Sequence, residues 1–167
     1  MSLGITSGQE GEKLRILQCS RDQQTRTILA INWHNVASSE VIRGSVNMDK
    51  LSGFLTSTMS ILGEGEEFIF VMDYVNFHHS VTVPESSNFS REFLPAYSSM
   101  LNLYEVFALI KSNVRQSSPL LDIQDQISSK KDASCSMIPQ HLENFIIHAE
   151  SFYRTCLNLE DVGGVII

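Results

Sequence analysis

The sequence predicts an α+β fold: a mainly antiparallel sheet of about five strands with one inserted helix, followed by a helical C-terminal part packed on one face. Three observations predict this fold. Segments rich in β-branched and aromatic residues fill the first half of the chain, one segment of helical period interrupts them, and segments of helical period dominate the second half. With 167 residues, the chain is long enough for one domain with a core of its own.

The first strands are expected at residues 13–20 and 25–34, and the polar stretch between them predicts a hairpin. Apolar residues fall on both faces of 25–34, which is typical of a central strand that is covered on both sides. A short third strand is expected at 40–46. Residues 1–12 are rich in Gly, Ser and Glu and are expected to form a flexible arm.

A helix is expected next, over residues 47–62. Asn47 suits its N-cap, Leu51, Phe54 and Leu55 begin an apolar stripe, and Gly63 suits its end. Strands at 68–74 and 77–83 are expected to form a second hairpin, which a polar loop at 85–90 follows.

The rest of the chain is expected to be helical. Pro95 suits the first turn of a helix over 95–115, whose apolar residues lie nearly all round, so that its own sheet or a partner must cover it. A short helix at 120–127, a linker-like loop at 128–136 and a last helix from Pro139 follow. We therefore expect a single domain over 13–161 and an apolar C-terminal tail at 162–167.

Composition and charge restrict the function classes. Asp and Glu number 19 against 12 Lys and Arg, and a formal charge of −7 argues against a nucleic-acid partner. The scattered cysteines Cys19, Cys135 and Cys156 and the polar N-terminus predict an intracellular protein without a transmembrane segment. The glycosylation pattern at Asn88 is attributed to chance.

No motif for catalysis, a cofactor or a metal is found. The glycine-rich phosphate loops and the nucleophile elbow are absent from the sequence. The adjacent residues His78 and His79 would point to opposite faces of a strand, which disfavours a shared metal ion. His141 and His148 lie seven residues apart on the last helix, too far apart to bind one ion together. Cys135 is interpreted as an exposed thiol.

Four hypotheses of function follow. The first is a non-enzymatic protein–protein interaction or assembly subunit that binds a protein partner or itself through Leu103, Phe107, Ile110, Val165, Ile166 and Ile167. The alternative is a small intracellular enzyme whose site is assembled from distant residues: His34, Asp73, His78, His79 and Cys135. The second alternative is an adaptor or regulatory binding module; the acidic charge makes a binder of nucleic acid the weakest hypothesis.

Overall fold

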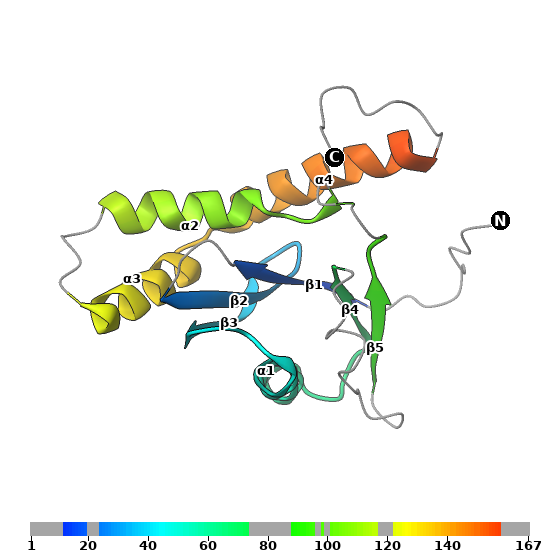
Figure 1. Cartoon of the computed structure of the whole chain (residues 1–167). Helices are drawn as coiled ribbons and strands as arrows, with labels where there is room; N and C mark the ends of the chain where they lie inside the picture. Colours follow the sequence, from blue (N-terminus) through cyan, green and yellow to red (C-terminus); the bar gives the residue numbers. More distant parts are fainter. Residues whose placement is uncertain are drawn as a thin grey trace.

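The computed structural model describes residues 12–19, 24–73, 88–95, 98, 101–116 and 122–157. Five strands and four helices follow one another within these residues (Figure 1). The strands are β1 (Glu12–Cys19), β2 (Thr25–Ile31), β3 (Val36–Arg43), β4 (Phe68–Met72) and β5 (Phe89–Phe93), and the helices are α1 (Met48–Leu62), α2 (Glu105–Gln116), α3 (Ile123–Cys135) and α4 (Pro139–Leu157). The predicted α+β class, the inserted helix and the helical C-terminal part are confirmed.

The sheet is mixed, in the order β3-β2-β1-β4-β5, which corrects the mainly antiparallel prediction. β1 pairs antiparallel with β2, and β2 with β3, whereas β1 and β4, and β4 and β5, are parallel. α1 lies in the connection from β3 to β4, and a crossover of this kind is what allows two strands to pair in parallel. As a result, β1, β4 and β5 have their carboxyl ends at the same edge of the sheet.

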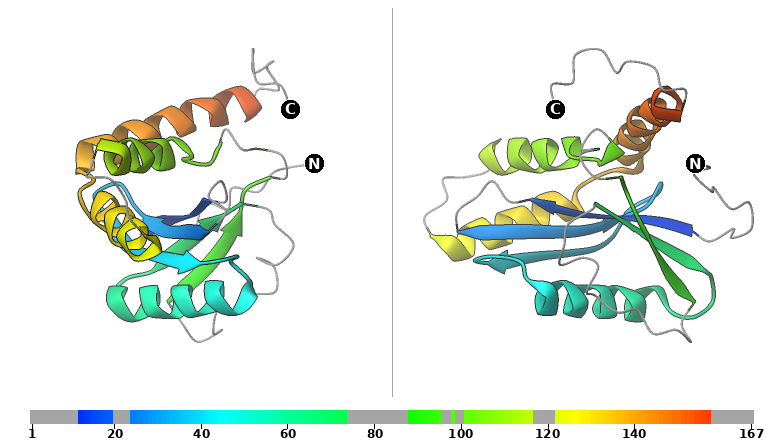
Figure 2. Two further views of the ribbon diagram at one scale, coloured as in Figure 1. Left: turned by 60° about the vertical axis from the view of Figure 1, so that its left-hand side comes forward. Right: turned by 45° about the vertical axis from the view of Figure 1, so that its right-hand side comes forward.

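Helices cover both faces of the sheet, as Figure 2 shows. α1 contributes Leu51, Phe54 and Leu55 to one core, where they meet apolar residues of all five strands. On the opposite face, α2 and α4 pack against β1 and β2 around Leu17 and Leu29. A smaller cluster joins Ile69 and Val71 of β4 to Leu94 and Leu101, with Phe152 and Tyr153 of α4 packed on it.

α1 matches the prediction closely. The Asn47 side chain accepts a hydrogen bond from the Lys50 N–H at 3.1 Å, and Gly63 ends the helix with φ at 76°. The three expected apolar residues, Leu51, Phe54 and Leu55, are buried.

Four local predictions are corrected. The third strand occupies Val36–Arg43 and not 40–46, because Gly44, at φ 78°, ends the pairing. The expected polar loop at 85–90 contains the start of β5, where Phe89 stacks on Phe68 and Phe70 at centroid distances of 5.2 and 5.4 Å. The predicted strand at 77–83, the arm up to residue 11 and the tail at 162–167 lie outside the described residues.

The other two corrections concern helices. α2 begins at Glu105, about ten residues later than predicted, because Ser98 and Asn102 bond to nearby backbone and favour turns. The expected loop at 128–136 is instead largely helical, as part of α3, whose N-cap Asp122 accepts from the Asp125 N–H at 2.8 Å. Lys130 fixes α3 to the sheet by donating to the Thr25 hydroxyl at 2.6 Å.

Candidate functional site

Asp73 directly follows β4 at the edge of the sheet where the three parallel strands end. Met72 belongs to the core under α1, whereas Val71 faces the cluster under α4. Because side chains alternate along a strand, the half-buried Asp73 is expected on the α4 side, with Val71. Crevices outside the carboxyl ends of parallel strands are where such sheets usually bind ligands.

A second carboxylate belongs to the layer of helices that covers this face. Glu105 is the first residue of that helix, and its Oε1 lies 3.5 Å from Nε2 of His148 on α4. The two side chains are 46% and 56% exposed, so the contact contributes little to stability. It does show that α4 passes beside the start of α2, as Figure 1 also shows.

A buried cation lies on the same face. Leu14 and Ile16 of β1 point into the core under α1, so Arg15 and Leu17 point the other way. Arg15 is 9% exposed, its Cζ lies 5.5 Å from the centre of the Tyr153 ring, and it is opposite Val71 in the pairing with β4. Its Nη1 is buried without a hydrogen-bond partner among the described residues. We use the name β4-end site for Arg15, Asp73, Glu105, His148 and Tyr153, which belong to this side of the sheet or to the helices that cover it.

The residues predicted for an interaction surface lie elsewhere. Leu103, Phe107 and Ile110 are buried in the core that α2 and α4 form with β1 and β2, so the chain's own sheet covers them. The other three predicted residues, Val165, Ile166 and Ile167, lie outside the described residues.

The residues suspected for an enzyme site are not brought together where the structure describes them. Asp73 is in the β4-end site, whereas His34 is exposed in the turn after β2 and Cys135 is exposed at the end of α3. His78 and His79 lie outside the described residues.

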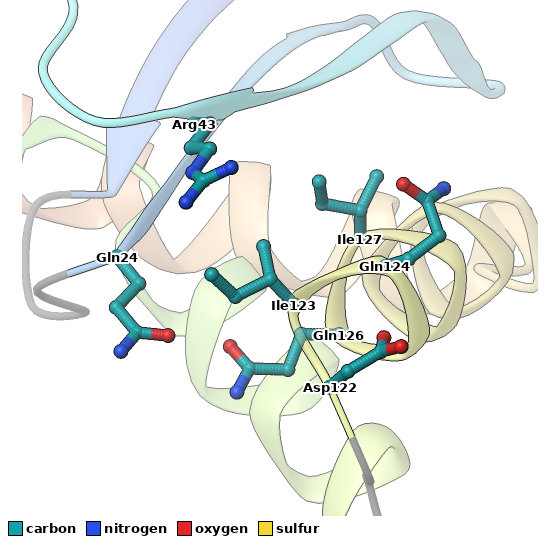
Figure 3. Close-up of a pocket in the computed structure, with 7 residues that line it drawn as sticks. All are labelled: Gln24, Arg43, Asp122, Ile123, Gln124, Gln126 and Ile127. Carbon is teal, nitrogen blue, oxygen red and sulfur yellow. The ribbon is translucent and has the colours of Figure 1, made fainter.

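A hollow of about 550 Å³ lies at another edge of the molecule, between α3 and the strands β2 and β3 (Figure 3). Gln24 and Arg43 line it from the sheet, and Asp122, Ile123, Gln124, Gln126 and Ile127 line it from α3. One cation and one carboxylate among three amides and two isoleucines give it mixed chemistry, without a group of titratable residues that would carry a reaction. The β4-end site is therefore the stronger candidate.

Two absences hold for the part of the chain that the structure describes. It contains no group of three or more His, Cys, Asp or Glu placed to bind one metal ion. None of its helices is both long and apolar enough to cross a membrane.

The sequence matches the family described as DDE superfamily endonuclease over residues 4–127, about three quarters of the chain. The chain belongs to this family. The matched segment holds all five strands and both α1 and α2, so it includes Arg15, Asp73 and Glu105.

Solved structures agree on the fold. The catalytic domain of the Mos1 mariner transposase superposes with a TM-score of 0.71 at 13% identity, covering 89% of this chain and 82% of that one. The Mos1 catalytic domain solved with raltegravir and Mn gives a TM-score of 0.69 at 15% identity, with the same coverage. The Mos1 strand transfer complex gives 0.59 at 14% identity, covering 86% of this chain and 45% of that one. No curated protein matches the sequence.

Family membership overturns two predictions. A non-enzymatic assembly subunit is wrong, because the family is one of enzymes, and the exclusion of nucleic acid is wrong, because an endonuclease acts on a nucleic-acid chain. The net charge led to the wrong prediction about nucleic acid because it does not show where the charged residues lie. Glu64, Glu66 and Glu67 precede β4, at the end of that strand opposite Asp73, and Asp122 and Asp125 lie on α3.

Two charged residues of the β4-end site, Glu105 and Arg15, were not among the residues predicted for a functional site. Glu105 was expected in the middle of a longer helix, where no partner was apparent by spacing, and its role depends on α2 starting there. Arg15 had a usable signal: it is a charged residue in the middle of an otherwise apolar segment, Leu14 to Leu17. A charged residue in such a strand either is buried and needs a partner, or lies on a face of the sheet that is exposed to solvent.

Proposed function

We propose that this chain is a transposase-type DNA-processing domain that binds DNA at the β4-end site. The observation that carries the proposal is the family match over residues 4–127, which spans the whole sheet and the site's residues from β1, β4 and α2. The fold shared with the Mos1 catalytic domain supports it. Such a domain would act inside the cell, where DNA is found.

The position of the site also limits the effect that the acidic turn before β4 has on it. The acidic turn at 64–67 lies at the far end of β4, and Glu67, six residues before Asp73, is about 20 Å from it along the strand. Charges separated by more than about 8–10 Å in solution are largely screened at physiological salt. A DNA phosphate at the β4-end site would therefore respond to Arg15, Asp73, Glu105 and His148 more than to the net charge of the chain.

One similar structure contains Mn, so we tested whether the β4-end site fits a divalent cation. Hydrolysis of phosphodiesters often uses such ions, which carboxylate oxygens bind. Asp73 and Glu105 are two candidate ligands, but β1 has no carboxylate between Lys13 and Gln18 and turns Arg15 and Leu17 towards this face. A buried guanidinium beside the site opposes a second cation, so the described residues do not fit a divalent metal ion.

The test is a titration of the full chain into a fluorescently labelled DNA duplex of about 30 base pairs, followed by anisotropy. Binding is expected, and it should weaken between about 50 and 200 mM salt, with a log–log slope of about −0.9 for each phosphate contacted. The absence of salt-dependent binding would reject the proposal.

A charge substitution locates the site. His148→Glu places a second negative charge beside Glu105 and is expected to weaken binding roughly three- to tenfold. The control is Gln140→Glu, another exposed position of α4 that lies eight residues away, or about 12 Å along the helix. Equal effects of the two substitutions would contradict the placement of the DNA.

A further inference from the structure

Arg15 is held in a position that its local contacts do not explain. The side chain is more than nine-tenths buried. Arg15 lies in the middle of β1, where this strand pairs with β4, and aromatic side chains of α4 pack over the neighbouring part of the sheet. Within the described part of the chain, its guanidinium lies over the Tyr153 ring, with Cζ 5.5 Å from the ring centre. Buried cations are normally paired with an anion or fully hydrogen-bonded, so the buried Nη1, which has no partner among the described residues, can donate to an anionic ligand.

The surroundings of Arg15 are those of the β4-end site. In the parallel pairing Arg15 is opposite Val71, and Asp73 follows two residues later, about 7 Å along the strand. Tyr153 lies nearly one and a half turns after His148 on α4, about 7.5 Å along the helix axis, and His148 contacts Glu105 of α2. Arg15 is therefore the fixed positive charge of this face, although two carboxylates lie on the same face.

A divalent cation would need carboxylates at the positions where β1 places Arg15 and Leu17. Hard cations are bound by several oxygen ligands, and carboxylates supply most of the compensating charge. Here the neighbouring strand β1 turns a guanidinium and the apolar Leu17 towards the face, and Leu17 is completely buried. By extension of the pairing of Ile16 with Met72, Leu17 is level with Asp73, where a third carboxylate would complete a metal site.

We propose that Arg15 provides, in place of a divalent metal ion, the positive charge that the β4-end site presents to a DNA phosphate. A guanidinium suits this role because it stays charged and offers a fork of N–H donors that matches phosphate oxygens. Tyr153, which is half-buried, lies over the Arg15 guanidinium and helps to hold it in place. The inference rests on the proposed DNA binding.

The first experiment measures DNA binding by the full chain, by anisotropy, in EDTA and in MgCl₂. The dissociation constant is expected to agree within about twofold between the two buffers, and Arg15→Gln is expected to weaken binding about tenfold in both. Arg43→Gln removes an exposed charge from β3, at the opposite edge of the sheet, and is expected to change binding less than twofold. Arg15→Met serves as a second neutral variant, and circular dichroism verifies that each variant is folded.

The second experiment measures metal binding directly, by the electron paramagnetic resonance signal of free Mn²⁺ in the presence of an equimolar amount of the chain. No stoichiometric binding is expected. A bound ion that Asp73→Asn or Glu105→Gln releases would overturn the inference. Asp22→Asn is included because Asp22, in the β1–β2 connection, lies outside the described residues.

The outcomes separate the two proposals. If the wild-type chain does not bind DNA, the proposed function fails and the role of Arg15 fails with it. If the chain binds DNA but requires a divalent ion, or if Arg15→Gln and Arg15→Met bind as tightly as wild type, only the inference about Arg15 fails. Metal-independent binding that both Arg15 variants lose supports it.

Discussion

Replacing Arg15 by methionine is expected to stabilise the fold although it weakens DNA binding. The effective cost of burying an ion is several kcal/mol, and Arg15 lies at 9% exposure with Nη1 unpaired among the described residues. The contact with the Tyr153 ring offsets about 1–2 kcal/mol of this cost. Methionine has a similar length and packs flexibly, so its own packing term is small. The free energy of unfolding should therefore rise by about 1–3 kcal/mol.

The assay is urea unfolding of the wild-type chain and of Arg15→Met, followed by circular dichroism, with a thermal melt of each. For a chain of this size the expected gain corresponds to a rise of about 2–10 °C in the melting temperature. A variant that is both more stable and weaker in binding DNA would show that Arg15 is kept for its ligand and not for the fold. Destabilisation by more than about 1 kcal/mol would refute the reasoning, because it would mean that Arg15 is well compensated in the free chain.

Two further predictions concern the scaffold. Phe70→Ala removes a fully buried ring of β4 that stacks on Phe89 and should lower the free energy of unfolding by about 3–5 kcal/mol in urea titrations. The control is Ile61→Ala, at a residue of α1 that is 66% exposed, which should change the free energy of unfolding by less than about 0.5 kcal/mol. Similar losses in the two variants would place the core elsewhere. Asp122→Ala removes the N-cap of α3 and should cost about 1 kcal/mol, whereas Asp122→Asn, which keeps a capping oxygen, should cost much less; equal losses in the two variants would argue against the cap.

Local signals in the sequence were sufficient where the cause is local. Asn47 and Gly63 define the ends of α1 by backbone chemistry that neighbouring residues supply, so the prediction of 47–62 is close to the observed helix. Likewise, Phe68, Phe70 and Met72 share the face of β4 that alternation predicts. The fold class followed from the order of these elements.

Other features depend on contacts between distant segments. The stretch at 128–136 is polar, and its composition predicts a loop. It is largely helical because α3 packs along β3 and β2 and because Lys130 donates a hydrogen bond to Thr25. The short β5 forms because β4 offers it a free edge and Phe89 finds Phe68 and Phe70 there. The periodicity of a single segment cannot predict its contacts with distant segments, such as those of α3 with β2 and β3 or those of β5 with β4.

The candidate site shows the same limit. Asp73 was among the suspected residues because of its type, but its position at the common carboxyl end of β1, β4 and β5 follows only from the parallel pairing. Glu105 and Arg15 come to the same side of the sheet from α2 and β1, which is a property of the assembled fold. The sequence contains these three residues at separations of more than thirty positions each.

The most direct test of the account is one titration of the wild-type chain into labelled duplex DNA, carried out in EDTA and in MnCl₂ at two salt concentrations. The account predicts binding of equal affinity with and without the metal, weaker at the higher salt concentration in both cases. Binding that appears only when Mn²⁺ is present, or no binding in either buffer, would contradict it.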